Sequence, residues 1–293
     1  MKKEEILEQL RKDLEMRGRS EETIRNYCLH VRLYQDYHGR AADEMGMEEI
    51  NAYLYYLLTE KKLSQASINA QNSSLRFVYG VTLDVTLNYK KLPRLKQTRR
   101  LPQLFTPEEV GAIIENAGNA CHKVMLMLAY GSGLRLSEIT GLKVTDIESN
   151  QNRILVRHGK GDRDRYAILP KTTLDALRKY WLSCTPRPRN WLFEAPVTGG
   201  QYHGRTLQDA FKAALRRSGV KKYGTIHTLR HCFATHLYED GHNLFALKKL
   251  LGHARIDTTI WYTQLAESEV LKLKSPIDSL PEKCGQKAGT GND

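Results

Sequence analysis

The sequence lacks the features that mark membrane-spanning, secreted or zinc-stabilised proteins. It has no apolar run near the roughly 18–20 residues that a membrane span needs. Its first residues, MKKEEILEQL, lack the apolar core of a signal peptide. The five cysteines are scattered and form no C-x-x-C pair, which argues against a zinc site or a disulfide framework. We therefore expect a cytoplasmic protein that has no metal site and does not associate with a membrane.

Acidic residues are scarce relative to basic ones. The chain has 45 Lys and Arg residues against 33 Asp and Glu, and its formal net charge is +12. Such a balance is typical of proteins that bind a polyanion, most often nucleic acid. The segment 90–100, KKLPRLKQTRR, carries six basic residues and no acidic one. A solvated linker in a basic protein is the alternative explanation of this charge.

Capping residues and apolar spacing predict two domains. In residues 1–89, Ser20 and Ser64 stand at the start of helical patterns, and four short helices would form a small all-α domain. Residues 90–100 have no periodicity and predict an extended linker. The sequence Thr106-Pro107 predicts a sharp helix start, which places the beginning of the second domain near residue 101.

The second domain, expected over residues 101–275, combines helices with a β-hairpin. Ile154 and Val156, then Tyr166 and Ile168, flank a turn rich in glycine and aspartate. Helices resume near Thr172, and residues 276–293 predict a disordered tail. The expected fold class is mainly α with a small β-hairpin or sheet, in two domains.

Cleavage of a DNA strand without a metal sets three chemical requirements. A nucleophile must attack phosphorus, cations must hold the non-bridging oxygens, and an acid must protonate the departing sugar oxygen. Arginine suits the second task because its planar fork matches two phosphate oxygens, and lysine or histidine suits the third. Residues of these types occur at four places in the second domain.

Two of these places come early in the domain. Arg135 follows a Gly-Ser-Gly turn at the start of a short helix, and Glu138 lies three residues later, close enough to brace it. Lys160 occupies the hairpin turn HGKGDRDR, from which a lysine can reach a neighbouring site. Taken singly, a surface ion pair and a solvated turn lysine explain these residues as well.

The other two places come later in the chain. His227 and Arg230 are one helical turn apart and share a helix face, and His253 precedes Tyr262 by nine residues. Taken singly, the His/Arg pair is more often structural, and any one of 15 tyrosines is usually part of the packing. A metal site built on three nearby histidines has no cysteine or acidic cluster to support it. These histidines are His227, His231 and His236.

Together these residues resemble the tyrosine recombinase (phage integrase) family. The segments GSGLRLSEI, GKGDRDRYAILP, HTLRHCFATHL and LLGH…YT match its motifs in order and at familiar spacing. Matches in order are far more specific than any one of them. The resemblance covers nearly the whole chain and implies a two-domain DNA clamp, with a helical core-binding domain and a mixed α/β catalytic domain. Size and layout are most similar to Xer-type recombinases or simple transposon-encoded integrases.

The resemblance implies site-specific recombination through a 3′-phosphotyrosyl intermediate and a Holliday junction, without metal, ATP or another cofactor. It makes Tyr262 the nucleophile and Lys160 the acid that protonates the leaving 5′ oxygen. Arg135 and Arg230 would bind the non-bridging oxygens of the phosphate.

The same resemblance gives three further residues a role. His227 would position the nucleophile or manage its proton, His253 would donate a hydrogen bond to the phosphate, and Glu138 would brace Arg135. The implied partner is double-stranded DNA with a specific recombination site, bound by a homotetramer at the nucleoid.

Contacts with DNA are expected mainly from the linker and the second domain. The basic linker residues would lie near phosphates. They are Lys90, Lys91, Arg94, Lys96, Arg99 and Arg100. In the first domain, the helix after Ser64 offers side chains suited to base edges. They are Gln65, Asn69, Asn72 and Arg76. A solvated polar face explains these four residues equally well.

Two alternatives share part of this interpretation. A type IB topoisomerase would use the same tyrosine chemistry without exchanging strands. A non-catalytic DNA-binding accessory protein of a mobile element would need neither Lys160 nor Tyr262. The motifs do not distinguish integration from excision, inversion or dimer resolution, and they do not specify the DNA target.

Overall fold

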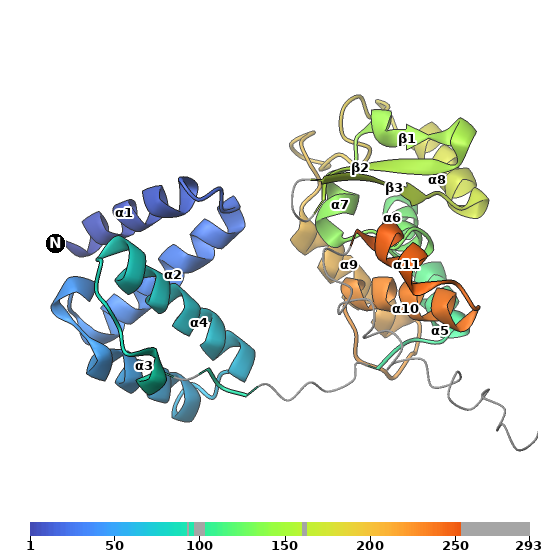
Figure 1. Cartoon of the computed structure of the whole chain (residues 1–293). Coiled ribbons are helices and arrows are strands. Elements are labelled where there is room, and N and C mark those ends of the chain that lie inside the picture. The colour runs from blue at the N-terminus through green and yellow to red at the C-terminus, as the bar shows by residue number, and fades with distance from the viewer. Residues whose placement is uncertain (93, 97–102, 160–162, 253–293) are drawn as a thin grey trace, which may run out of the picture. The chain divides into compact units, whose positions relative to one another are not determined.

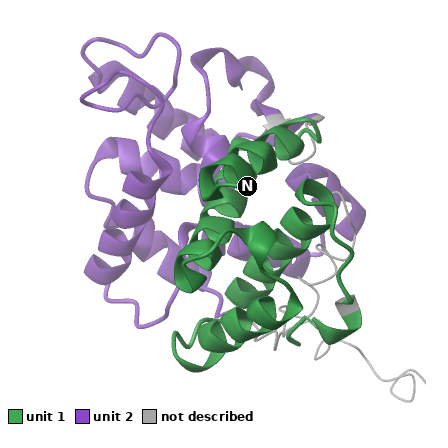
Figure 2. Ribbon diagram, turned by 90° about the vertical axis from the view of Figure 1, so that its left-hand side faces the viewer, with its two compact units in different colours: residues 1–100 green, residues 101–293 purple. Residues whose placement is uncertain are grey.

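The structure is a computed structural model that describes residues 1–92, 94–96, 103–159 and 163–252. The chain forms two compact units, residues 1–100 and residues 101–293, each with its own apolar core (Figure 2). Helices dominate both units and a three-stranded sheet lies in unit 2, which confirms the expected fold class (Figure 1). Across the described residues, no helix is both long and apolar enough to cross a bilayer.

Unit 1 consists of helices and their connecting loops in its described part. Its α-helices are α1 (Lys3–Glu15), α2 (Glu21–His38), α3 (Met47–Thr59) and α4 (Gln65–Phe77). Short turns follow at η1 (Ala42–Glu44), η2 (Val78–Thr82) and η3 (Tyr89–Lys91). As predicted, Ser20 and Ser64 cap α2 and α4, because each side chain accepts a hydrogen bond from the backbone N–H three residues later.

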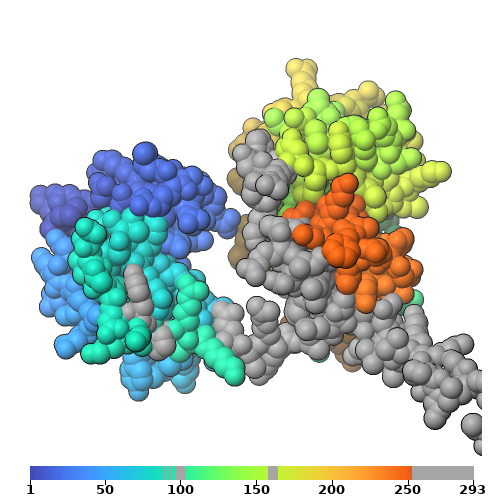
Figure 3. Space-filling view, in the orientation of Figure 1, coloured from blue at the N-terminus to red at the C-terminus, as the bar shows by residue number. Residues whose placement is uncertain are grey.

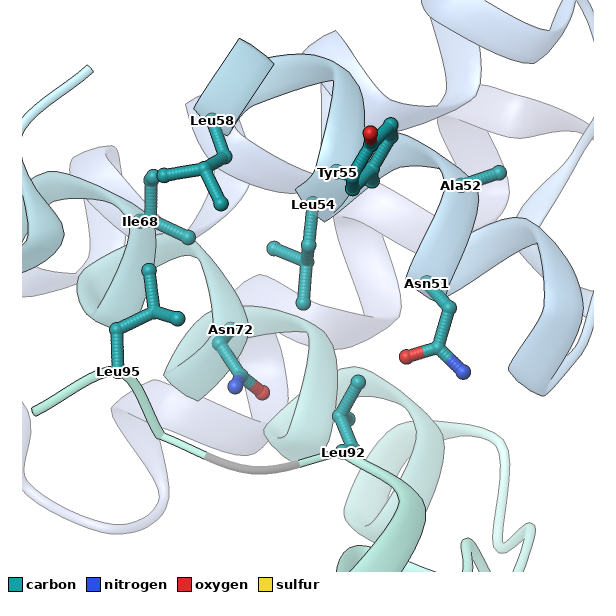
Figure 4. Close-up of a pocket in the computed structure, with 9 residues that line it drawn as sticks. All are labelled: Asn51, Ala52, Leu54, Tyr55, Leu58, Ile68, Asn72, Leu92 and Leu95. Atoms are coloured by element: carbon teal, nitrogen blue, oxygen red, sulfur yellow. The ribbon is translucent and has the colours of Figure 1, made fainter. Parts of the chain in front are cut away.

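Leu92 and Leu95 pack on unit 1, within the segment 90–100 that the sequence predicted to be an extended linker. Leu92 is buried in the core of unit 1, and Leu95 packs against that core. Both leucines line a groove of about 510 Å³ together with Leu54 and Leu58 of α3 (Figure 4). The side-chain amide of Asn69 pairs with the backbone of Leu95, since Nδ2 donates to its oxygen (2.8 Å) and Oδ1 accepts from its N–H (2.9 Å). Apolar burial and this amide pair hold the segment on α4.

These contacts change the expectation for the polar face of α4. Asn72 is 2% exposed and accepts a hydrogen bond from Nε of Arg76 at 3.0 Å. Arg76 also donates to the backbone oxygen of Leu92. The prediction that Asn72 reads a base edge is therefore wrong, because its side chain is buried. A DNA contact by Arg76 stays a prediction.

Unit 2 is arranged around one central helix, α6. The α-helices are α5 (Pro107–Glu115), α6 (Ala120–Gly131), α7 (Leu136–Thr140), α8 (Lys171–Ser183), α9 (Gly204–Arg217), α10 (Ile226–Glu239) and α11 (Leu244–Leu251). Two short turns, η4 (Val144–Asp146) and η5 (Ser149–Gln151), lie beside the sheet. Helix α6 contacts α5, α8, α9 and α10 and buries Val124, Leu126 and Leu128 among them. The predicted capping box of α5 is present between Thr106 and Glu109.

The sheet of unit 2 is antiparallel, in the order β1 (Ile147–Glu148), β2 (Arg153–Gly159) and β3 (Arg163–Ile168). Ile154 pairs with Ala167, and both are buried on the inner face. Tyr166 and Ile168, which helped to predict the hairpin, are exposed at 46% and 42%. Because side chains alternate along a strand, Arg165 shares the inner face with Ala167.

Replacing Asn69 with alanine should release residues 92–95 from α4, because it removes both hydrogen bonds to Leu95. We expect the Leu95 amide to exchange with deuterium about tenfold faster, as a loss of about 1–2 kcal/mol predicts. Asn51→Ala is the matched control, since Asn51 lines the same groove and its side chain makes no hydrogen bond within the described residues. Equal protection of Leu95 in the two variants would contradict the anchoring role.

Candidate active site

The site is formed where four segments of unit 2 that are distant in sequence meet. Arg135 caps the start of α7, with Glu138 at its third position, and His227 and Arg230 lie on the first turns of α10. Strand β3 and the end of α11 complete the site (Figure 1). Three other predicted residues and the tail lie outside the described residues. These residues are Lys160, His253 and Tyr262.

The carboxylate of Glu138 is the centre of the described site. Its Oε1 accepts hydrogen bonds from Nη1 of Arg135 (2.7 Å) and Nη1 of Arg165 (2.8 Å). Its Oε2 accepts from the backbone N–H of Arg135 (2.7 Å) and Nη2 of Arg165 (2.9 Å). Nη1 of Arg230 approaches the same oxygen to 3.6 Å. The predicted contact between Arg135 and Glu138 is thus present. The same carboxylate also binds Arg165 and lies within ion-pair distance of Arg230.

Electrostatics keep this carboxylate ionised although it is only 6% exposed. Burial by itself raises the pKa of Glu138. The hydrogen bonds and charge of Arg165, followed by those of Arg135, outweigh burial and lower the pKa to about 2. Glu138 therefore carries a full negative charge among the arginines at neutral pH.

Arg230 is held by backbone oxygens from two sides. Its Nη1 donates to the oxygen of Gly133, and its Nη2 donates to the oxygen of Leu251 at 2.6 Å. The side chain is 1% exposed. Gly133 has a φ of +61°, and a Cβ there would lie 2.4 Å from the ring of Phe233 on α10. Only glycine therefore lets this turn approach α10 closely enough to present its oxygen to Arg230.

The two histidines next to Arg230 are neutral near pH 7. Burial lowers the pKa of His227, and the charges of Arg230 and Arg135 lower it further. Burial, His227 and Arg230 lower the pKa of His231 to about 4. The rings of His227 and His231 meet edge to face, with centroids 4.7 Å apart. A neutral imidazole can accept a proton, which suits one of the two roles that the family resemblance implies for His227.

The three histidines of α10 do not form a metal site. His236 pairs with the hydroxyl of Tyr130, at 3.0 Å from its Nδ1. Within the described ranges, no group of three or more His, Cys, Asp or Glu residues is placed to hold a metal ion. The alternative of a three-histidine site has no support from this geometry.

Arg165 is a member of the site that sequence reasoning missed. It is 10% exposed, and besides binding Glu138 it donates from Nε to the backbone oxygen of Leu250 at 3.0 Å. The end of α11 (orange in Figure 3) lies against the strands at this point. Strand alternation gave no signal for it, because the apolar Tyr166 and Ile168 suggest that theirs is the inner face, whereas the structure exposes them and turns Arg165 inward.

Comparison with known proteins identifies the family. The chain matches the phage integrase family over residues 103–269 and the phage integrase N-terminal SAM-like domain over residues 6–88. The chain belongs to the phage integrase family. It is a tyrosine site-specific recombinase, and its activity is DNA recombination and integration.

Relatives of the recombinase match it over almost its full length. A putative integrase/recombinase of Sinorhizobium fredii is 36% identical over 277 residues, which cover 94% of this chain and 89% of the relative. The tyrosine recombinase XerA of Thermococcus kodakarensis is 30% identical over 290 residues, covering 96% and 98%. A lambda integrase dimer bound to a COC′ core site has a TM-score of 0.72 at 20% identity and covers 94% and 99%, a likeness of fold.

Glu138→Gln should destabilise unit 2 in a pH-dependent way. The pKa of Glu138 falls from its ordinary value of 4.5 to about 2 on folding, so its charge stabilises the fold by about 3 kcal/mol above pH 4.5. This stabilisation is lost as the pH falls from about 4.5 to about 2, because the unfolded chain binds the proton first.

Urea unfolding followed by tryptophan fluorescence measures this effect. All three tryptophans, Trp181, Trp191 and Trp261, belong to unit 2, so their signal reports on that unit alone. We expect wild type and Glu138→Gln to differ by about 3 kcal/mol at pH 7 and to converge toward pH 2. A difference that does not change with pH would show that the carboxylate charge is not what stabilises the fold.

Proposed function

We propose that this recombinase binds double-stranded DNA at a specific recombination site and cleaves one strand at a time with Tyr262. The observation that carries the proposal is the meeting of Arg135 and Arg230 at one carboxylate and at the end of α11. Nη2 of Arg230 donates to the oxygen of Leu251 (2.6 Å), and Nη2 of Arg135 donates to that of Gly252 (3.5 Å). Tyr262 follows ten residues later in the chain.

The identity of the partner is supported by the solved structures that this fold resembles. They include a lambda integrase bound to a core site and a XerH recombinase bound to a palindromic difH substrate. The described linker residues also suit a phosphate backbone, because all of the basic ones are exposed. These are Lys90, Lys91, Arg94 and Lys96. Arg99 and Arg100 lie outside the described residues.

The proposed cleavage balances without a cofactor. The phenolate oxygen of Tyr262 attacks phosphorus and forms a 3′-phosphotyrosyl bond. The bond between phosphorus and the 5′ oxygen breaks, and Lys160 gives that oxygen its proton. A 5′-hydroxyl from the partner duplex then reverses the same steps and rejoins the strand. Because the covalent bond conserves the energy of the phosphodiester, neither ATP nor a metal is required.

The arginines and histidines would handle the charge and the protons of this reaction. Arg135 is 20% exposed and would meet the phosphate first, whereas Arg230 is 1% exposed and would reach the phosphate only after its surroundings move. His227, neutral at pH 7, would accept the proton of Tyr262. His253 would donate a hydrogen bond to the phosphate.

The complete reaction would require four copies of the chain. Recombination exchanges two strands on each of two duplexes, so four nucleophiles act in turn. The recombinase would therefore work at the nucleoid as a homotetramer on DNA, through a Holliday junction.

Tyr262→Phe should keep DNA affinity and lose covalent capture, because it removes only the nucleophilic oxygen. The probe is a pool of duplexes with a random centre and a nick at a fixed position, incubated with the full chain. We expect the wild type to retain part of the pool through denaturing electrophoresis and the variant to retain none. Binding by gel shift is the control, and an adduct formed by Tyr262→Phe would disprove the assignment.

Lys160→Ala should be rescued by a better leaving group. A duplex with sulfur in place of the scissile 5′ oxygen needs less protonation when the bond breaks. We expect the variant to cleave the sulfur duplex at nearly the wild-type rate and the oxygen duplex about 10²- to 10⁴-fold more slowly, as for loss of a general acid. Equal losses on both duplexes would exclude Lys160 as the acid.

A further inference from the structure

Arg165 binds the carboxylate of Glu138 through both terminal nitrogens of its guanidinium group. Its two terminal nitrogens bind the two carboxylate oxygens at 2.8 and 2.9 Å, a bidentate geometry that fixes the carboxylate plane. Arg135 reaches the same carboxylate with one side-chain nitrogen at 2.7 Å. The orientation of the carboxylate, and with it the direction of the Arg135 side chain, therefore depends on Arg165.

The third side-chain donor of Arg165 reaches α11. Its Nε donates to the oxygen of Leu250 at 3.0 Å. The side chain also lies against Gly252, which ends α11 with a φ of +63°, and a Cβ on Gly252 would come within 2.7 Å of Cδ of Arg165. Arg165 thus joins three parts of the chain: strand β3 on which it lies, the carboxylate on α7 and the last turn of α11.

We infer that Arg165 is a positioning residue of the recombinase, which orients Arg135 through Glu138 and holds the end of α11 against the strand that leads from Lys160. This inference rests on the proposed function. Lys160 precedes Arg165 by five residues, and Tyr262 follows Gly252 by ten. One buried side chain therefore contacts Glu138, which binds the proposed anion clamp Arg135, and the end of α11, after which the chain continues to the proposed nucleophile.

A direct contact between Arg165 and DNA is the competing explanation, and the geometry disfavours it. The carboxylate engages both terminal nitrogens, a backbone oxygen engages Nε, and the side chain is 10% exposed. These bonds use three of the five guanidinium N–H groups, and a side chain that is 10% exposed offers little surface to a phosphate. Loss of Arg165 should therefore slow the reaction of bound DNA and leave its affinity unchanged.

The test compares Arg165→Gln with the wild type on one defined duplex. The probe is the nicked duplex that wild-type protein captures covalently from the random pool. Single-turnover adduct formation at saturating duplex gives a rate constant and an amplitude, and gel shifts give the Kd. We expect the rate constant to fall about 10²-fold, as for a misplacement of about 1 Å. The Kd should change less than about threefold, since the DNA contacts remain.

The amplitude distinguishes positioning from general destabilisation. A variant that is partly unfolded gives fewer adducts at an unchanged rate constant, whereas a mispositioned site gives a full amplitude at a reduced rate constant. If Arg165→Gln fails to fold, Arg165→Lys decides the question. Lysine keeps the charge and loses the bidentate fork, so we expect a full amplitude with a rate constant below that of the wild type.

Arg157→Gln is the matched control. Asp146, like Glu138, is buried, caps a short helix by accepting a backbone N–H, and binds a strand arginine. It accepts from the N–H of Lys143 at 2.9 Å and from Nε of Arg157 at 2.7 Å, with 3% of its side chain exposed. Arg157→Gln should lower the stability of unit 2 and leave the adduct rate constant within about twofold of the wild type, because Arg157 does not bind Glu138.

The possible results separate the two proposals. If the wild type captures no duplex, the proposed function fails. If the wild type captures DNA and Arg165→Gln reacts at the wild-type rate, the inference about Arg165 fails alone. A weakened Kd with an unchanged rate constant would make Arg165 a DNA contact and overturn the inference, and so would an equal loss of rate in Arg157→Gln.

Discussion

The packing of unit 2 depends on a buried carboxylate that three arginines share. Guanidinium groups from α7, β3 and α10 converge on Glu138, and together they would repel one another without its charge. The carboxylate in turn could not remain ionised at 6% exposure without them. Each charge is therefore tolerated only because the others are present, and the contacts with Glu138 link α7, β3 and α10.

Two glycines give the arginines their backbone partners. Gly133 lets the turn before α7 approach Phe233 of α10, and its oxygen accepts from Arg230. Gly252 ends α11 in the left-handed conformation and leaves room for Arg165. A larger side chain at either place would displace a charged group as well as a helix. The arginines around Glu138 therefore depend on the close backbone approaches that the two glycines allow.

The sequence predicted the local parts of this construction and missed the connection between them. Glu138 three residues after Arg135, the helix face shared by His227 and Arg230, and the caps at Ser20, Ser64 and Thr106 all follow from short-range spacing. The role of Arg165 does not, because the apolar Tyr166 and Ile168 point outward and the sheet register decides which side chain faces inward. The family resemblance named Arg135, Glu138 and Arg230. It omitted Arg165, which binds Glu138.

The prediction for α4 is wrong at Asn72, and long-range pairing explains why this part of the helix is covered. Asn, Gln and Arg residues on a helix suit base edges, but they suit exposed peptide groups equally well. Asn69 and Arg76 bind the backbone of Leu95 and Leu92, and the apolar side chains of these two leucines complete the attachment. Nothing in the local pattern of α4 indicates that a segment some twenty residues later will occupy its polar face.

The anchoring of Leu95 shortens the tether between the two units. Leu95 is held on unit 1, and Phe105 is buried in unit 2, where its N–H donates to Sγ of Cys232. Leu95 and Phe105 are ten positions apart in the sequence. Because a fully extended chain spans at most about 3.5 Å per residue, these two anchors stay within about 35 Å of each other. With one unit on a duplex, the other would meet the same duplex at a local concentration of roughly millimolar order. The cost of bringing the second unit to DNA would then be set by the length of this tether rather than by the concentration of the protein.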